Sequence, residues 1–343
     1  MKAEKTDGEK RAEELIESVK DVEAGKIVYS VYPSEKSWGY FTGGTIKAAK
    51  DGRGKAEVYV LFPGVELSYC RFNAELAHDS GNKRSGIMQI NHCRLGRIGW
   101  RTKGGRGVYL GEGDLSVHMA ECCEEAEIVL PWGVYEGISI LIDLEKFKQN
   151  IPEVLSEAGL DLDELYNKYC NTAEPFAKPV SDRLEHVFSE LYDLPQGMRL
   201  PYYKLKVQEL LMFLSMERVS ELNVKRYVTK QAETIQAIHE ELISDISKRY
   251  TIEELARKYL INTTTLKNTF KAVYGMPIAS YMKRYRMKQA MIIIQETNKS
   301  LSEVAEAVGY ENQSKFTRAF KEYSDMLPKE YRNRVKATKS RQS

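Results

Sequence analysis

Cysteine is scarce in this chain, and long apolar runs are missing. Five cysteines, an odd number without regular spacing, occur among 343 residues, which is typical of reduced thiols and not of a disulfide framework. The longest apolar runs, such as GISILI and AMIII, are far too short to cross a bilayer. The first residues, MKAEKTDGEKRAEE, are charged and lack the apolar stretch of a signal peptide. We therefore expect a cytoplasmic protein without a membrane segment.

Charge is unevenly distributed along the chain. From Lys230 onward 21 Lys and Arg stand against 13 Asp and Glu, a net charge of +8. Subtraction from the totals of 51 and 49 leaves 30 against 36 before that point, a net charge of −6. A basic C-terminal third favours contact with a polyanion such as nucleic acid, although an ordinary solvated surface has the same composition.

The first two thirds of the chain divide into three stretches. Residues 1–55 form a variable segment with a helix expected over Ala12–Ala24, after which glycines interrupt any period. Residues 56–145 contain short strand-like runs separated by turns such as GGRG and GEGD. This pattern is typical of a β-sandwich or barrel that can hold a small ligand. Residues 146–223 change to a helical pattern, and the domain boundary is expected near Val224–Thr229.

The helix expected over Tyr203–Glu221, YKLKVQELLMFLSMERVSE, is the most apolar in the chain. One interpretation makes it a core helix of its own domain. The other makes it a helix that pairs with its copy in a homodimer. The apolar side chains on which both interpretations depend are Leu210, Leu211, Phe213, Leu214 and Val219.

A helical unit occurs twice after Lys230. The stretches TIEE from Thr251 and SLSE from Ser300 are capping boxes, in which a hydroxyl residue and a carboxylate three residues on begin a helix. Five residues after each cap stands a small residue, Ala256 or Ala305, that allows a second helix to cross closely. Each first helix then ends at a tight turn. Two such pairs predict two helix-turn-helix units, whose second helices enter the DNA major groove.

The second helix of each unit has an apolar seam and a polar face. The seams consist of Leu266 and Phe270 in the first unit and of Phe316 and Phe320 in the second. The polar faces carry hydrogen-bonding groups suited to base edges, flanked by cations suited to phosphates, and they lack carboxylates as far as Glu322. The candidate DNA-binding residues are Thr264, Lys267, Asn268, Lys271, Gln313, Ser314, Thr317, Arg318 and Lys321.

The segment Ile278–Glu296 joins the two units. As a helix it would be about 28 Å long, which approaches the ~34 Å between successive major-groove faces. A stiff connector of this length would set both second helices on one side of a duplex. Its cations could contact phosphates between the grooves. They are Lys283, Arg284, Arg286 and Lys288.

Residues 250–332 resemble the DNA-binding domain of the AraC/XylS family of transcription regulators. The resemblance covers both units and is most specific in LSEVAEAVGYENQSKFTRAFKEYSDMLPKEYR. It implies that seven residues of the second helices face bases, and that Pro328 and Tyr331 are structural. The seven are Thr264, Lys267, Asn268, Gln313, Ser314, Thr317 and Arg318. The chain departs from the family at Asp325, where a glycine is usual. Asp tolerates left-handed geometry better than most residues, so a local adjustment is expected there.

The resemblance extends in part to the N-terminal half, which is similar to the cupin-like sensor and dimerisation half of many family members. The turn Gly111–Leu115 (GEGDL) is a familiar element of that half. The implied function is activation of a promoter through RNA polymerase, controlled by a small-molecule effector. The implied fold class is α+β and multidomain, with a tandem helix-turn-helix domain over residues 230–335 and a basic tail over 336–343.

A repressor, or an architectural DNA-binding protein without an effector, remains an alternative. We predict no enzyme, because no nucleophile, base and orienting group occur together. His78, His92 and His118 lie far apart, which argues against a metal-dependent cupin enzyme.

The cysteines and aromatic residues of the N-terminal half have two interpretations each. The pairs Cys122-Cys123 and His92-Cys93, with Cys70, could hold a thiophilic metal or a haem, but buried small residues are favoured and no cofactor is predicted. Five aromatic residues could line a ligand cavity, but core positions are favoured. They are Tyr69, Phe72, Trp100, Trp132 and Tyr135.

Overall fold

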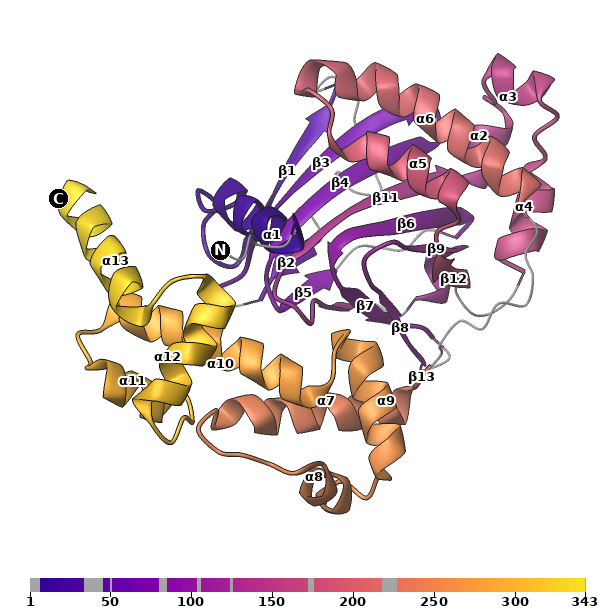
Figure 1. The fold of residues 1–343 in the computed structure, drawn as a ribbon. Helices are drawn as coiled ribbons and strands as arrows, with labels where there is room; N and C mark the ends of the chain where they lie inside the picture. Colours follow the sequence, from indigo (N-terminus) through magenta and orange to yellow (C-terminus); the bar gives the residue numbers. More distant parts are fainter. Residues whose placement is uncertain are drawn as a thin grey trace. The chain divides into compact units, whose positions relative to one another are not determined.

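The computed structural model describes residues 7–33, 46–49, 51–79, 85–103, 106–123, 126–171, 176–217 and 227–342. The chain divides into a β-rich unit over Gly8–Thr229 and a helical unit that includes Lys230–Ser343 (Figure 1). The predicted α+β, multidomain fold class is therefore confirmed. None of the described helices is long and apolar enough to cross a membrane.

The β-rich unit contains two sheets. In order across the larger sheet, the strands are β1 (Lys26–Tyr32), β3 (Arg53–Phe62), β4 (Val65–Asn73), β11 (Tyr135–Asp143), β6 (Ile87–Gly96), β9 (Asp114–Met119) and β12 (Phe176–Pro179). The smaller sheet has the order β13 (Tyr227–Val228), β8 (Arg106–Leu110), β7 (Ile98–Arg101), β10 (Ala126–Val129), β5 (Leu76–Asp79) and β2 (Ile46–Ala48). The runs read as strands in the sequence are strands in the structure.

The N-terminal stretch differs in detail from its prediction. The helix expected over Ala12–Ala24 is α1, Asp7–Ser18, and the chain then turns through Gly25, whose φ is +80°. Strand β1 follows and pairs in parallel with β3, from Lys26 beside Arg53 to Tyr32 beside Tyr59. The described residues from Gly8 to Lys55 thus contribute a helix and strands to the β-rich unit.

Helices cover one face of the larger sheet (Figure 1). They are α2 (Leu144–Lys148), α3 (Glu153–Glu157), α4 (Leu162–Tyr169), α5 (Asp182–Tyr192) and α6 (Gln196–Met216). The apolar helix expected from Tyr203 is α6, and its Leu210 and Leu211 are fully buried in the core against the sheet. The core interpretation therefore describes this face of α6. Val219 lies outside the described residues.

The elements of the described helical unit are α7 (Thr229–Ser244), α8 (Ile252–Lys258), α9 (Thr263–Tyr274), α10 (Ile278–Glu296), α11 (Leu301–Ala307), α12 (Gln313–Ser324) and α13 (Pro328–Gln342). Both predicted capping boxes are present: Thr251 and Ser300 each accept from a backbone N–H three residues on, and the glutamates there bond back. Helix α13 runs through most of the stretch expected as a basic tail.

Helix α10 belongs to the cores of both halves of the helical unit. Near its start Tyr281 packs edge-on against Phe270 of α9, with ring centroids 5.7 Å apart. Further along, Met287 and Ala290 are buried with Phe316 of α12. One rigid helix thus positions α9 and α12 relative to each other, with the bounds that the sequence predicts.

Candidate nucleic-acid interface

Helix α9 presents the polar face that the sequence predicts. Asn262 caps the helix, its side chain accepting from the N–H of Thr265 at 2.7 Å. Leu266 and Phe270 are fully buried, which turns the opposite face of the helix outward. The four predicted residues of this helix, Thr264, Lys267, Asn268 and Lys271, are all exposed.

Helix α12 is built in the same way. Asn312 caps it by accepting from the N–H of Lys315 at 2.9 Å. Phe316 and Phe320 are fully buried. Of the five predicted residues of this helix, Gln313, Ser314, Arg318 and Lys321 are exposed and Thr317 is partly buried.

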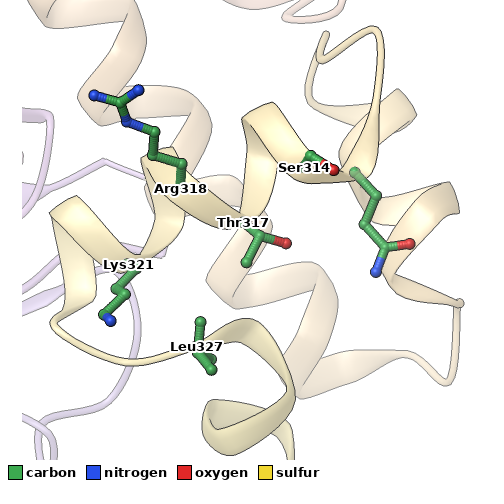
Figure 2. Close-up of a pocket in the computed structure, with 6 residues that line it drawn as sticks. Ser314, Thr317, Arg318, Lys321 and Leu327 are labelled. Carbon is green, nitrogen blue, oxygen red and sulfur yellow. The ribbon is translucent and has the colours of Figure 1, made fainter.

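The outer face of α12 borders a hollow of about 550 Å³. All five predicted residues of this helix line it, and Figure 2 shows how they lie. The sixth lining residue is Leu327, just before α13, which the sequence reasoning missed. The sequence signal for Leu327 was its position as an apolar residue between the left-handed Asp325 and Pro328. Amides, hydroxyls and cations are the groups that contact base edges and phosphates.

Three ion pairs involve cations of α10 and α12. Arg318 Nε donates to Glu322 Oε1 at 3.1 Å, and Lys283 Nζ donates to Glu322 Oε2 at 2.7 Å. Lys315 Nζ donates to Glu311 Oε2 at 2.6 Å. The hydrogen bonds from Lys283 and Arg318 lower the pKa of Glu322, so its carboxylate is charged at neutral pH.

Two of the predicted phosphate contacts on α10 are occupied within the protein. Lys283 pairs with Glu322. Arg286 donates from Nε to the carbonyl of Ile246 and from Nη2 to the carbonyl of Lys248, each at 2.8 Å. Because these carbonyls follow α7, Arg286 ties the end of that helix to α10. The structure thus gives Arg286 a role within the fold.

The departure at Asp325 has the expected geometry. Its φ is +54°, in the left-handed region, and its N–H bonds to the carbonyl of Lys321 at 3.0 Å. Gly275 ends α9 in the same way, with φ of +74°. Asp325 therefore ends α12 as glycine ends α9.

The β-rich unit has a second polar region, on the larger sheet's face opposite the helices. Ser68, Ser139, Asn91 and Ser116 are cross-strand neighbours on β4, β11, β6 and β9. All are at least 90% buried. Asn91 Nδ2 donates to Ser116 Oγ at 3.3 Å, whereas Ser68 Oγ has no hydrogen-bond partner among the described residues. A buried hydroxyl without a partner is costly unless something else bonds to it.

Four of the five cysteines are buried, and Cys122 is partly buried. Burial raises the pKa of the Cys70 thiol to about 12 and that of Cys93 well above its usual value, so both are protonated at neutral pH. Among the described residues, His, Cys, Asp and Glu form no group of three or more that could hold a metal ion.

The five aromatic candidates divide by burial. Tyr69, Phe72 and Tyr135 are at least 95% buried in the two cores of this unit. Trp100 and Trp132 are partly buried. The core interpretation therefore holds for the first three.

The helical unit is similar to domains of known proteins. A family model described as a helix-turn-helix domain matches residues 255–334. A Streptomyces lividans protein named as an AraC-like transcription regulator is 33% identical over 88 residues, which cover 26% of this chain and 29% of that protein. The transcriptional activator RhaR of Mannheimia succiniciproducens is 24% identical over 100 residues, 29% of this chain and 36% of RhaR.

A solved structure is similar to part of the chain. It is the C-terminal domain of the response regulator yesN from Fusobacterium nucleatum, which is 34% identical, covers 29% of this chain and 96% of that domain, and has a TM-score of 0.27. The chain spans less than half of the two curated relatives, so the similarity concerns the helix-turn-helix domain. The helical unit therefore contains a helix-turn-helix domain similar to those of AraC-like transcription regulators.

Proposed function

We propose that this protein binds a specific promoter sequence through α9 and α12 and activates transcription under the control of a small-molecule effector. The observation that carries the proposal is the repetition of one capped helix pair with an exposed, polar and cationic second helix. If these helices were only solvated surface, there would be no reason for the same capped pair to occur twice. Two such helices on one connector suit two successive major-groove faces.

The effector would bind in the β-rich unit. The row from Ser68 to Ser116 offers hydroxyl and amide groups in a buried setting, where hydrogen bonds to a ligand are strong. A second row runs parallel to it and contains Glu66, Gln89 and His118. A ligand that prefers one arrangement of the two units would shift DNA binding, typically by a coupling of ~1–3 kcal/mol. Activation would follow from contact with RNA polymerase, as the family resemblance implies.

The exposed side of α6 supports a homodimer. Met198, Leu205 and Met216 are 56%, 64% and 67% exposed. Steps of seven and eleven residues are close to two and three helical turns, so the three side chains share one stripe. An apolar stripe opposite the buried face suits a second copy of the helix. Leu205→Glu should convert the dimer to a monomer in analytical ultracentrifugation, and an unchanged sedimentation coefficient would contradict this part of the proposal.

DNA recognition is tested by selecting bound sequences from random duplexes with the full chain, followed by anisotropy titrations in a salt series. We expect a motif of two blocks about one helical turn apart, bound well above random DNA. Arg318→Ala should relax the preference at one position, whereas Lys321→Ala should weaken all sequences alike and lower the salt slope by about 1. A steep salt slope without an enriched motif would indicate an architectural DNA-binding protein.

Effector control is tested with the selected sequence in hand. A metabolite library is screened for compounds that raise the thermal unfolding midpoint of the full chain. Compounds that do so are added to a transcription assay with purified RNA polymerase and the selected promoter. Increased transcript supports the activator, decreased transcript indicates a repressor, and the absence of any stabilising compound would contradict effector control.

A further inference from the structure

The guanidinium of Arg318 is hydrogen-bonded at Nε, and its two terminal nitrogens are exposed to solvent. Its Nε donates to Glu322 Oε1 at 3.1 Å, one helical turn further along α12. Its side chain is 84% exposed. The two terminal nitrogens of the guanidinium make no other hydrogen bond or ion pair among the described residues. These nitrogens form the planar fork that matches two acceptors at once.

The carboxylate that holds Arg318 is itself held from a second helix. Glu322 Oε2 accepts from Lys283 Nζ of α10 at 2.7 Å. Both oxygens of Glu322 are therefore engaged, one by each cation. Because α10 is fixed in the core through residues such as Met287, Lys283 connects the carboxylate to the rigid part of the unit. The three side chains form a chain from α10 to the outer face of α12.

We propose that Arg318 reads a guanine through its two terminal nitrogens, and that Glu322, anchored by Lys283, is the positioning residue for this contact. This inference rests on the proposed DNA-binding function. Guanine presents its N7 and O6 acceptors side by side in the major groove, and the arginine fork fits both. A guanidinium that is already oriented loses less side-chain entropy when it binds.

The Glu322 carboxylate also disfavours a phosphate as the partner of Arg318. A phosphate beside Glu322 would bring two negative charges together, whereas a guanine edge is neutral and offers acceptors only to the fork. Lys321, the next residue of the helix face to point outward, makes no ion pair among the described side chains and has no such conflict. The two neighbouring cations thus have different partners.

The experiment uses the duplex selected from random DNA and the full chain. Each guanine of that duplex is replaced in turn by 7-deazaguanine, which removes the N7 acceptor and keeps base pairing. We expect the wild-type protein to lose about tenfold in affinity at one guanine. Arg318→Ala should show no loss at that position.

Glu322→Gln tests the positioning role. It should reduce the tenfold discrimination at that guanine by several-fold, while affinity for random duplex rises because a negative charge is removed. Lys283→Met should reduce the same discrimination. Glu311→Gln is the matched control. Glu311 is also an exposed carboxylate of the helical unit, but it pairs with Lys315 and not with Arg318. This substitution should raise affinity for random DNA and keep the discrimination.

Three outcomes would overturn the inference, and one concerns the function beneath it. Equal effects of Glu322→Gln and Glu311→Gln on discrimination would mean that only net charge matters. Insensitivity to 7-deazaguanine at every position, with specific binding retained, would remove the guanine contact and leave the proposed function standing. Loss at one guanine that persists in Arg318→Ala would assign the contact elsewhere. Equal binding of selected and random duplexes would contradict the proposed function itself.

Discussion

Leu260 and Gly309 occupy equivalent places in the turns of the two helix-turn-helix units, and both have left-handed backbone, with φ of +52° and +77°. A Cβ on Gly309 would lie 2.7 Å from the carbonyl oxygen of Ser247. Leu260, in contrast, is 95% exposed. The second turn therefore needs glycine for both space and conformation, whereas the first needs it for conformation alone.

Leu260→Gly should stabilise the helical unit. A left-handed L-residue costs about 1–2 kcal/mol, and glycine removes this cost. Part of the gain is offset because glycine has more conformational freedom to lose when the chain folds. We expect a net gain of about 0.5–1 kcal/mol in the free energy of unfolding, measured by urea denaturation. Gly309→Ala is the opposite case and should destabilise by about 2 kcal/mol or more, through strain and overlap. Destabilisation by Leu260→Gly would show that the leucine makes contacts that outweigh its strain.

His239 should make the helical unit less stable in mild acid. Its ring stacks on Tyr274 with centroids 4.5 Å apart, and Nε2 lies 2.7 Å from the hydroxyl of Tyr281. Burial lowers the pKa of His239 to about 4 from its usual 6.5. As pH falls below about 6.5 the unfolded chain takes up a proton that the folded chain does not. The unfolding free energy should therefore fall by up to about 1.4 kcal/mol per pH unit, down to about pH 4.

The measurement is urea denaturation at pH 7, 6 and 5. His239→Gln should remove the contribution of this histidine to the slope between pH 6.5 and 5, whereas the contribution of His92, whose pKa burial also lowers, should remain. His186→Gln is the control, because His186 is 67% exposed and lies outside the helical unit. A slope unchanged by His239→Gln would assign the pH dependence to other groups.

Arg286→Ala should weaken the fold and leave the electrostatics of DNA binding nearly unchanged. The substitution removes two charged hydrogen bonds to the carbonyls of Ile246 and Lys248. A loss of about 1.5–3 kcal/mol in unfolding free energy is expected. Lys321→Ala should show the reverse pattern, with stability kept and the salt slope reduced. A reduced salt slope with full stability in Arg286→Ala would restore the phosphate role.

Ser68→Ala should separate effector binding from stability. The hydroxyl is buried without a partner among the described residues, so its removal should leave the unfolding free energy unchanged or raise it by up to about 1 kcal/mol. Stabilisation by an effector found in the screen should decrease. Asn91→Ala, which loses bonds to Ser116 and Gln89, should destabilise the apoprotein by about 1–3 kcal/mol. Undiminished stabilisation of Ser68→Ala by the effector would place the ligand elsewhere.

The parts of the site predictable from the sequence were those set by neighbours in the chain. The caps at Thr251 and Ser300 depend on groups within four residues, and both are present as predicted. The bounds of α10 follow from an uninterrupted helical stretch between Pro277 and Thr297.

The contacts that sequence reasoning missed join distant residues. Lys283 meets Glu322 across 39 positions, and Arg286 meets Ile246 across 40. Such pairs turn a cation that looks free for phosphate into one with a protein partner. The parallel pairing of β1 with β3 was also hidden, because glycines between them interrupt the period on which a strand prediction depends.

The two units share one design and differ in side chains, and they are joined by the single helix α10. Thr264, Lys267 and Asn268 face outward in one, and Gln313, Thr317 and Arg318 line the hollow of the other. A surface made of two different second helices in a fixed order has a direction along the DNA. One copy of the protein on a promoter would therefore point toward one gene and away from its neighbour, and reversing the site would reverse which of the two it serves.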